Sequence, residues 1–196
     1  MPNNVNTCGS PIQRSLAWCQ GQPVMPGIRR RLYYTSKNNI VQWPTYSTDS
    51  GGAYAYAVLT GSFTLKADTT WHYIDILAEK STLTSEAQGE APSQTQLNKL
   101  TAVHPGVGKE ASAVACYLNN SDNVFIVQDM SGQWRVVGSQ FYETKTTVAQ
   151  DNGQGATGNA STTISVEATD VCPSPFYQGT LTTEDGELDL SGAASG

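Results

Sequence analysis

Residues 124–146, VFIVQDMSGQWRVVGSQFYETKT, bring together side chains that could bind a sugar or carry out acid–base chemistry. The charged ones are Asp129, Arg135 and Glu143, and the aromatic ones are Trp134, Phe141 and Tyr142. Because glycosidases hold two acids across a cleft, Asp129 and Glu143 form a candidate carboxylate pair. A plain β-hairpin is the alternative explanation of the same segment.

The hairpin interpretation rests on turn chemistry. At the first position of a four-residue turn, Asp129 can accept hydrogen bonds from backbone amides, and Gly132 suits the last position. Trp134 and Phe141 then become core or sheet-surface residues. Arg135 is expected to pair with an acid of its own sheet or of a neighbouring subunit. We therefore predict a hairpin here.

Other patterns of catalytic chemistry are absent or weak. The chain has no Gly-x-Ser-x-Gly motif and no phosphate-binding loop. His72 and Asp75, three residues apart, fall on opposite faces of a strand, and His104 precedes Pro105 in a turn. The helix start at 108–110 is a weak candidate for an anion site. We expect no catalytic residue, no metal, no cofactor and no enzyme activity.

The four cysteines, Cys8, Cys19, Cys116 and Cys172, lack the spacing of a zinc site. We interpret them as thiols in a reducing cytosol. A Cys8–Cys19 disulfide remains open if the protein is exported.

The composition is that of a strand-rich chain of low charge. Of 196 residues, 38% are hydrophobic and 14% charged. The net charge is −6, with basic residues concentrated in 1–50 and acidic residues in 110–196. This polarity suits head-to-tail contacts between identical subunits, and the acidic balance disfavours tight binding of DNA or RNA. No apolar run approaches the ~18 residues needed to span a bilayer, and the N-terminus lacks a signal-peptide pattern, so we expect cytoplasmic synthesis and no membrane partner.

Alternation and turn signals predict strands along most of the chain. The predicted strands are 28–34, 40–43, 54–66 with a break at Gly61, 70–80, 81–90, 94–106, the hairpin 123–138, 140–149, 161–168 and 176–183. The acidic run 182–190 is expected to be an edge strand or a flexible tail. In the predicted helix, 108–120, an apolar stripe runs from Ala111 to Leu118, and Asn119–Asn120 are a left-handed stop.

These elements predict a fold that is mainly β with one α-helix near 109–118. We expect an antiparallel β-sandwich or barrel. It would form a single domain over 28–190, between an irregular N-terminal arm, 1–27, and a flexible C-terminus, 191–196.

Aromatic residues flank the loop 45–53, which we expect to project and make contacts. The predicted subunit-interface residues are Trp43, Tyr46, Asp49, Tyr54 and Tyr56. Trp71 and Trp134 fall within strand patterns and are predicted to lie in the core. The loop aromatics could instead form a sugar platform, which leaves a carbohydrate-binding alternative open.

Several segments within about 60–180 together resemble the tail tube (major tail) proteins of long-tailed phages, particularly those of Bacteroides-type genomes and prophages. They are LTGSFTLKADTTWHYIDI, KSTLTSEAQGE, HPGVGKEASAVACYLNNSDNVFIVQDMSGQWRVVGS and TTISVEATDVCPSPFYQGTL. The helix, the Asn-Asn pair, the valine-rich strand, the Asp-x-x-Gly hairpin and the Pro-Phe-Tyr-x-Gly ending follow in the family's order. The resemblance does not place residues 1–27.

The resemblance implies a β-sandwich or barrel flanked by a helix, with six copies closing into a ring whose sheets line a channel. Rings would stack head to tail into the tube through which DNA leaves the capsid, in the virion tail. The implied partners are further copies of the chain and other tail proteins, such as the tape measure and tail-end proteins. DNA would pass without tight binding. The alternative is a carbohydrate-binding β-sandwich module of a phage or bacterial surface protein, and a hydrolase ranks third.

Overall fold

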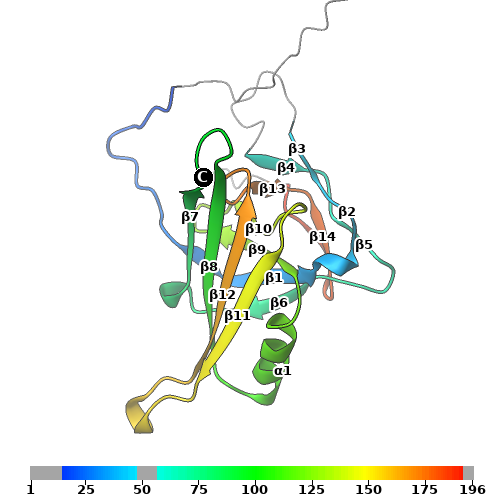
Figure 1. Ribbon diagram of the computed structural model, residues 1–196. Helices are drawn as coiled ribbons and strands as arrows, with labels where there is room; N and C mark the ends of the chain where they lie inside the picture. The colour runs from blue at the N-terminus through cyan, green and yellow to red at the C-terminus, as the bar shows by residue number, and fades with distance from the viewer. Residues whose placement is uncertain (1–14, 48–56, 192–196) are drawn as a thin grey trace, which may run out of the picture.

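The computed structural model describes residues 15–47 and 57–191 (Figure 1). A seven-stranded sheet has the order β3 (Thr45–Tyr46), β4 (Val58–Thr60), β13 (Phe176–Gln178), β10 (Trp134–Val137), β9 (Asn123–Asp129), β1 (Ile28–Ser36) and β6 (His72–Asp75). A four-stranded sheet has the order β11 (Thr144–Asp151), β12 (Ser161–Asp170), β8 (Thr95–Pro105) and β7 (Thr82–Gln88).

Smaller elements complete the chain. Two short antiparallel pairs are β2 (Ile40–Gln42) with β5 (Thr64–Leu65), and β14 (Thr180–Thr183) with β15 (Gly186–Asp189). The α-helix α1 covers Lys109–Leu118, and single 3-10 turns cover Lys37–Asn39, Ala78–Lys80 and Gly155–Thr157. The fold is therefore mainly β with one helix, as predicted, and the sandwich alternative describes it. Among the described strands, the pair β4–β13 is parallel, whereas the other strand pairs are antiparallel.

Strand β9 forms the centre of the molecule because both of its faces are buried. Phe125 and Val127 point into one core, and Val124 and Ile126 point into another; all four are 0% exposed. Successive side chains of a strand alternate between its faces, so an unbroken apolar run requires a covering layer on each side. The valine-rich segment thus places the seven-stranded sheet in the middle of three layers.

The four-stranded sheet and α1 cover one face of this central sheet (Figure 1). Leu100 of β8, with Ile164 and Val166 of β12, faces the inner side chains of β1 and β9. Leu118 of α1 is fully buried in the same core. Burying each of these large side chains contributes about 1.5–3 kcal/mol.

The two short strand pairs cover the other face. Phe63, Trp71 and Leu181 are fully or almost fully buried against Val136 and Tyr177. The prediction that Trp71 lies in the core is confirmed. The acidic run 182–190 forms much of the β14–β15 hairpin, and its apolar residues close this second core. It is an ordered hairpin up to residue 190 rather than a flexible tail.

The helix prediction is confirmed, but its predicted stop is wrong. Ala115 and Leu118, two residues of the predicted stripe, are buried. Asn119 remains right-handed, with φ −66° and ψ −20°. The side-chain amide of Asn120 donates to the Cys116 carbonyl at 3.0 Å, and the Ser121 hydroxyl donates to the Tyr117 carbonyl at 2.7 Å. Side chains therefore satisfy the last carbonyls, so no left-handed residue is needed.

Two predicted strands are divided in the structure. Gly61, with φ +88°, separates β4 in the large sheet from β5 in a short pair, which confirms the predicted break. In 70–80 only β6 is a regular strand, because Ala78–Lys80 form a 3-10 turn. Residues 15–27 contain neither strand nor helix.

Candidate functional site

The segment around Asp129 is a hairpin, as predicted. The Gly132 amide donates to the Asp129 carbonyl at 3.0 Å, and Asp129 Oδ1 accepts the Gln133 amide at 2.9 Å. Arg135 Nε lies 3.3 Å from Asp129 Oδ2, so Arg135 pairs with an acid of its own sheet. Asp129 thus organises the turn and holds Arg135 in place.

The structure separates the candidate carboxylate pair. Asp129 ends β9, whereas Glu143 precedes Thr144, whose amide donates to Asp122 next to the other end of β9. A strand of this length spans about 20 Å, about twice the largest separation that glycosidases use. Phe141, predicted in the core or on a sheet, is 71% exposed and lies outside the strands, so that prediction is wrong.

The tryptophan of the segment, Trp134, packs where the sequence placed it. Trp134 is half-buried against the second core, with its ring centroid 5.9 Å from that of Tyr33. It therefore presents no free aromatic platform for a ligand.

The predicted interface aromatics are only partly described. Trp43 is half-buried, and its ring meets that of Phe63 edge-on at 5.4 Å between centroids. Tyr46 is half-buried as well, and its hydroxyl donates to Asp170 Oδ1 at 2.7 Å. The remaining predicted interface residues, Asp49, Tyr54 and Tyr56, lie outside the described residues, as does Cys8.

The contact between Tyr46 and Asp170 belongs to a buried polar network that sequence reasoning missed. Asp170 is 3% exposed, and burial raises the pKa of its carboxyl group although Tyr46 and the Val171 amide donate to it. Burial, with the charge of Asp170, also raises the pKa of Cys172 to about 12. This network fastens β3 to the end of β12, and a thiol held so firmly protonated is a poor nucleophile.

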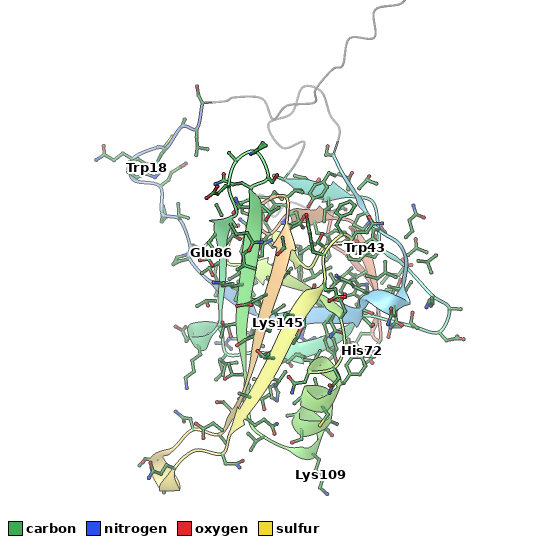
Figure 2. All side chains as sticks on the ribbon, viewed as in Figure 1. Trp18, Trp43, His72, Glu86, Lys109 and Lys145 are labelled. Atoms are coloured by element: carbon green, nitrogen blue, oxygen red, sulfur yellow. The ribbon has the colours of Figure 1, made fainter. Side chains whose placement is uncertain are left out.

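The outer face of the four-stranded sheet carries a row of alternating charges. Lys145 lies opposite Glu167, Glu167 lies opposite Lys99, and Lys99 forms an ion pair with Glu86. Figure 2 shows Glu86 and Lys145 on opposite flanks of the sheet. The row sums to zero charge, and Ser and Thr dominate the other outward positions of β12. This face is polar, and Asp151 at the projecting end of β11 adds a single negative charge to the balanced row.

The charge polarity of the sequence is partly neutralised by the fold. Arg31, from the basic N-terminal part, pairs with Asp75 at 2.7 Å. Lys37 pairs with Asp122 at 3.1 Å. Some of the basic residues expected to contact another subunit are thus engaged within the chain.

The described part of the arm exposes large apolar side chains. Leu16 is 99% exposed, Trp18 72%, Val24 80% and Met25 61%. Scattered single apolar residues are normal on a surface, whereas four within ten residues form a concentrated apolar segment, a feature that is common at interaction sites. Sequence reasoning placed the arm as irregular without assigning it a role, although its lack of charge between residues 15 and 27 was a usable signal.

An apolar groove lies between α1 and the neighbouring strands. It is about 390 Å³ in volume, within the range of small binding pockets. Tyr34 of β1, Ile74 of β6 and Ile164 of β12 line it from the sheets. Ala111 and Val114 line it from the helix, at two positions of the predicted stripe.

Polar side chains form the rest of the groove lining. His72 Nδ1 lies 2.5 Å from Glu184 Oε1, and His104 Nδ1 lies 2.8 Å from the Asp75 carbonyl oxygen. Glu110, in the first turn of α1, also lines the groove with its carboxylate. His72 thus links β6 to the turn of the β14–β15 hairpin, and His104 links β8 to β6. His104 lies within β8, so the prediction that it stands in a turn is wrong.

No protein-family model, curated protein or solved structure matches this chain at a significant level. In the described part of the chain, no group of three or more His, Cys, Asp and Glu side chains is arranged to hold a metal ion. Within the same stretches, no helix is long and apolar enough to cross a bilayer.

Proposed function

We propose that this chain is a self-assembling structural protein, the tail tube subunit of a long-tailed phage or prophage. Rings of six copies, the number that the sequence resemblance implies, stack head to tail around a channel for DNA. One observation carries the proposal: the molecule has projections at opposite ends of its four-stranded sheet (Figure 1). The β11–β12 hairpin projects at one end, and the N-terminal arm extends toward the other.

The outer face of the four-stranded sheet is suited to line the channel. DNA binding rests on the neutralisation of phosphates by Lys and Arg, and its strength grows with the number of such contacts. Because Lys99 and Lys145 alternate with Glu86 and Glu167, phosphates meet no net attraction there. DNA can therefore pass along this face without being held.

The two edges of the same sheet differ in a way that favours ring closure. On β11, the Val148 amide donates to Asn119 Oδ1 at 2.7 Å, and the Thr144 amide donates to Asp122 Oδ1 at 2.9 Å. The β7 edge has no strand beyond it in the described residues. A contact between unlike edges is heterologous, and repeated heterologous contacts close a ring when the rotation permits.

The carbohydrate-binding alternative receives less support. Its named residues include Trp43 and Tyr46, and both are half-buried in internal contacts. A sugar platform requires an aromatic face that is open to solvent, which the packing of Trp43 against Phe63 restricts.

Negative-stain electron microscopy of the purified protein at increasing concentration tests the proposal. We expect rings, and then tubes with a central channel. Particles of single-chain size at every concentration, together with glycan binding that is lost in Trp43→Ala, would favour the carbohydrate-binding alternative.

A further inference from the structure

The arm is attached to the body at its base, and its outer part is exposed. The Met130 amide donates to the Gly27 carbonyl at 3.1 Å, and Val24 and Met25 border a cleft beside β7. Residues 15–20 are all exposed, and Figure 2 shows Trp18 far from the body of the molecule. Leu16 and Trp18 therefore lack an apolar environment within their own chain.

The groove beside α1 provides such an environment at the opposite side of the molecule. Figure 2 places His72, on its lining, away from Trp18 and toward the end at which the β11–β12 hairpin projects. In a head-to-tail stack, the arm end of one copy faces the groove end of the next. The contact joins two different surfaces, so it can repeat along the stack.

We propose that Leu16 and Trp18 of one copy insert into the groove between α1 and β6 of the next copy. The proposal rests on the self-assembly proposed above and names the contact that joins successive copies. Tyr34, Val114 and Ile164 form the apolar wall of the pocket, which suits an indole ring.

Charge complementarity supports the same occupant. Residues 1–27 contain one basic residue, Arg14, and no acid. Of the acidic side chains in the groove lining, Asp75 pairs with Arg31 and Glu184 with His72, whereas Glu110 forms no ion pair with a described residue. An apolar segment that follows a basic residue thus matches an apolar wall next to the Glu110 carboxylate.

Chemical cross-linking tests the contact directly. In the full chain with Cys8 and Cys116 replaced by Ser, Glu110→Cys places a thiol at the groove, and the natural Cys19 adjoins Trp18. After a short bismaleimide reagent is added to mixed ¹⁴N- and ¹⁵N-labelled protein, we expect a product of mixed isotope composition that joins Cys19 to the thiol introduced at position 110. A product formed only within one chain, or none, would overturn the proposal.

Two complementary variants test the same contact without a cross-linker. Ala111→Arg blocks the groove, and Leu16→Ala with Trp18→Ala removes the inserted side chains. Because loss of a central aromatic anchor weakens an interface strongly, we expect the contact between successive copies to be at least about thirtyfold weaker in each variant alone than in the wild type. Mixing the two variants should restore part of this contact, since one variant retains the arm and the other retains the groove.

Ala113→Arg is the matched control, because Ala113 is an exposed residue of the same helix that does not line the groove. Equal weakening by Ala111→Arg and Ala113→Arg would overturn the contact. Tubes formed by Ala111→Arg as readily as by the wild type would overturn it while leaving the tube proposal intact. A mixed-isotope cross-link without rings or tubes would overturn the tube proposal and leave the contact.

Discussion

The β11–β12 hairpin and the N-terminal arm both project from the sandwich, but only the hairpin is held by its own hydrogen bonds. Its strands remain in register out to the pair Asp151–Ser161. The Thr162 hydroxyl donates to the Gly106 carbonyl at 2.8 Å and accepts from Gln150 at 3.1 Å. The arm has no such ladder over residues 15–27.

The two projections also differ in composition. The hairpin tip, 152–159, is rich in Gly and Asn and contains no large apolar residue, so water satisfies its surface. The arm exposes Leu16 and Trp18, which water solvates poorly. The hairpin is therefore supported by contacts within its own chain, whereas the exposed apolar residues of the arm have no such support in the described residues, which is why we propose a partner for the arm and none for the hairpin.

Removal of residues 1–20 should have the largest effect on assembly and almost none on the stability of the monomer. Because residues 15–20 form no strand and are all exposed, we expect the free energy of unfolding to change by less than about 0.5 kcal/mol. Stacking of rings into tubes should be lost, whereas the rings themselves, which close through the sheet edges, should remain. Urea denaturation and electron microscopy measure the two quantities, and a large loss of stability would show that the arm belongs to the monomer fold.

Thr162→Val tests the self-support of the hairpin. The substitution preserves shape but leaves the Gly106 carbonyl and the Gln150 amide without their buried partner, at a cost of about 1–2 kcal/mol. Thr163→Val, on the outer face of β12, is the control and should change stability by less than about 0.5 kcal/mol. Equal stability of the two variants in thermal unfolding would contradict this assignment.

The far end of β12 is held by a buried acid, and so its stability should depend on pH. The pKa of Asp170 is raised in the folded state, so the folded protein binds its proton more tightly than the unfolded chain does. The resulting stabilisation is present below the unfolded pKa of about 3.9 and is lost as pH rises through the raised value. Asparagine does not titrate, so the free energy of unfolding of Asp170→Asn should increase relative to that of the wild type as pH rises from 3 to 7.

Unfolding measured by urea at both pH values checks this prediction. Both proteins contain the other acids, so the titration of those acids cancels in the difference between the two free energies of unfolding. A difference that is independent of pH, or that changes in the opposite direction, would contradict the raised pKa.

The smallest effect on stability is expected on the outer sheet face. Glu86→Gln with Glu167→Gln removes only exposed partners of Lys99 and Lys145, so stability should change by less than about 0.5 kcal/mol. The face then has excess positive charge, and weak DNA binding that salt abolishes should appear in a filter or fluorescence assay. Unchanged DNA binding at low salt would argue against this face as the channel lining.

Much of the fold could be predicted because local patterns and burial agree. The apolar run 124–127 required two covered faces, the turn at Asp129 had suitable residues at its ends, and the stripe from Ala111 to Leu118 fixed the buried side of α1. Pairings between distant segments could not be read in this way. The parallel pair β4–β13 and the division of 70–80 depend on which sheet each piece joins.

The candidate site was less predictable for a physical reason. Whether an aromatic residue faces a partner or its own core depends on tertiary packing, and Trp43 and Tyr46 face inward. Asp170 continues the inward alternation of Ile164, Val166 and Ala168, so its burial was readable from period two. The groove combines side chains from six segments that are distant in the sequence, and no local pattern shows it.

Sedimentation velocity over a range of protein concentrations tests the central claim most directly. The account predicts a discrete closed oligomer near six times the mass of one chain, followed at higher concentration by much larger stacked species. It also predicts that removal of residues 1–20 abolishes the stacked species. A single species with the mass of one chain at every concentration would contradict the account.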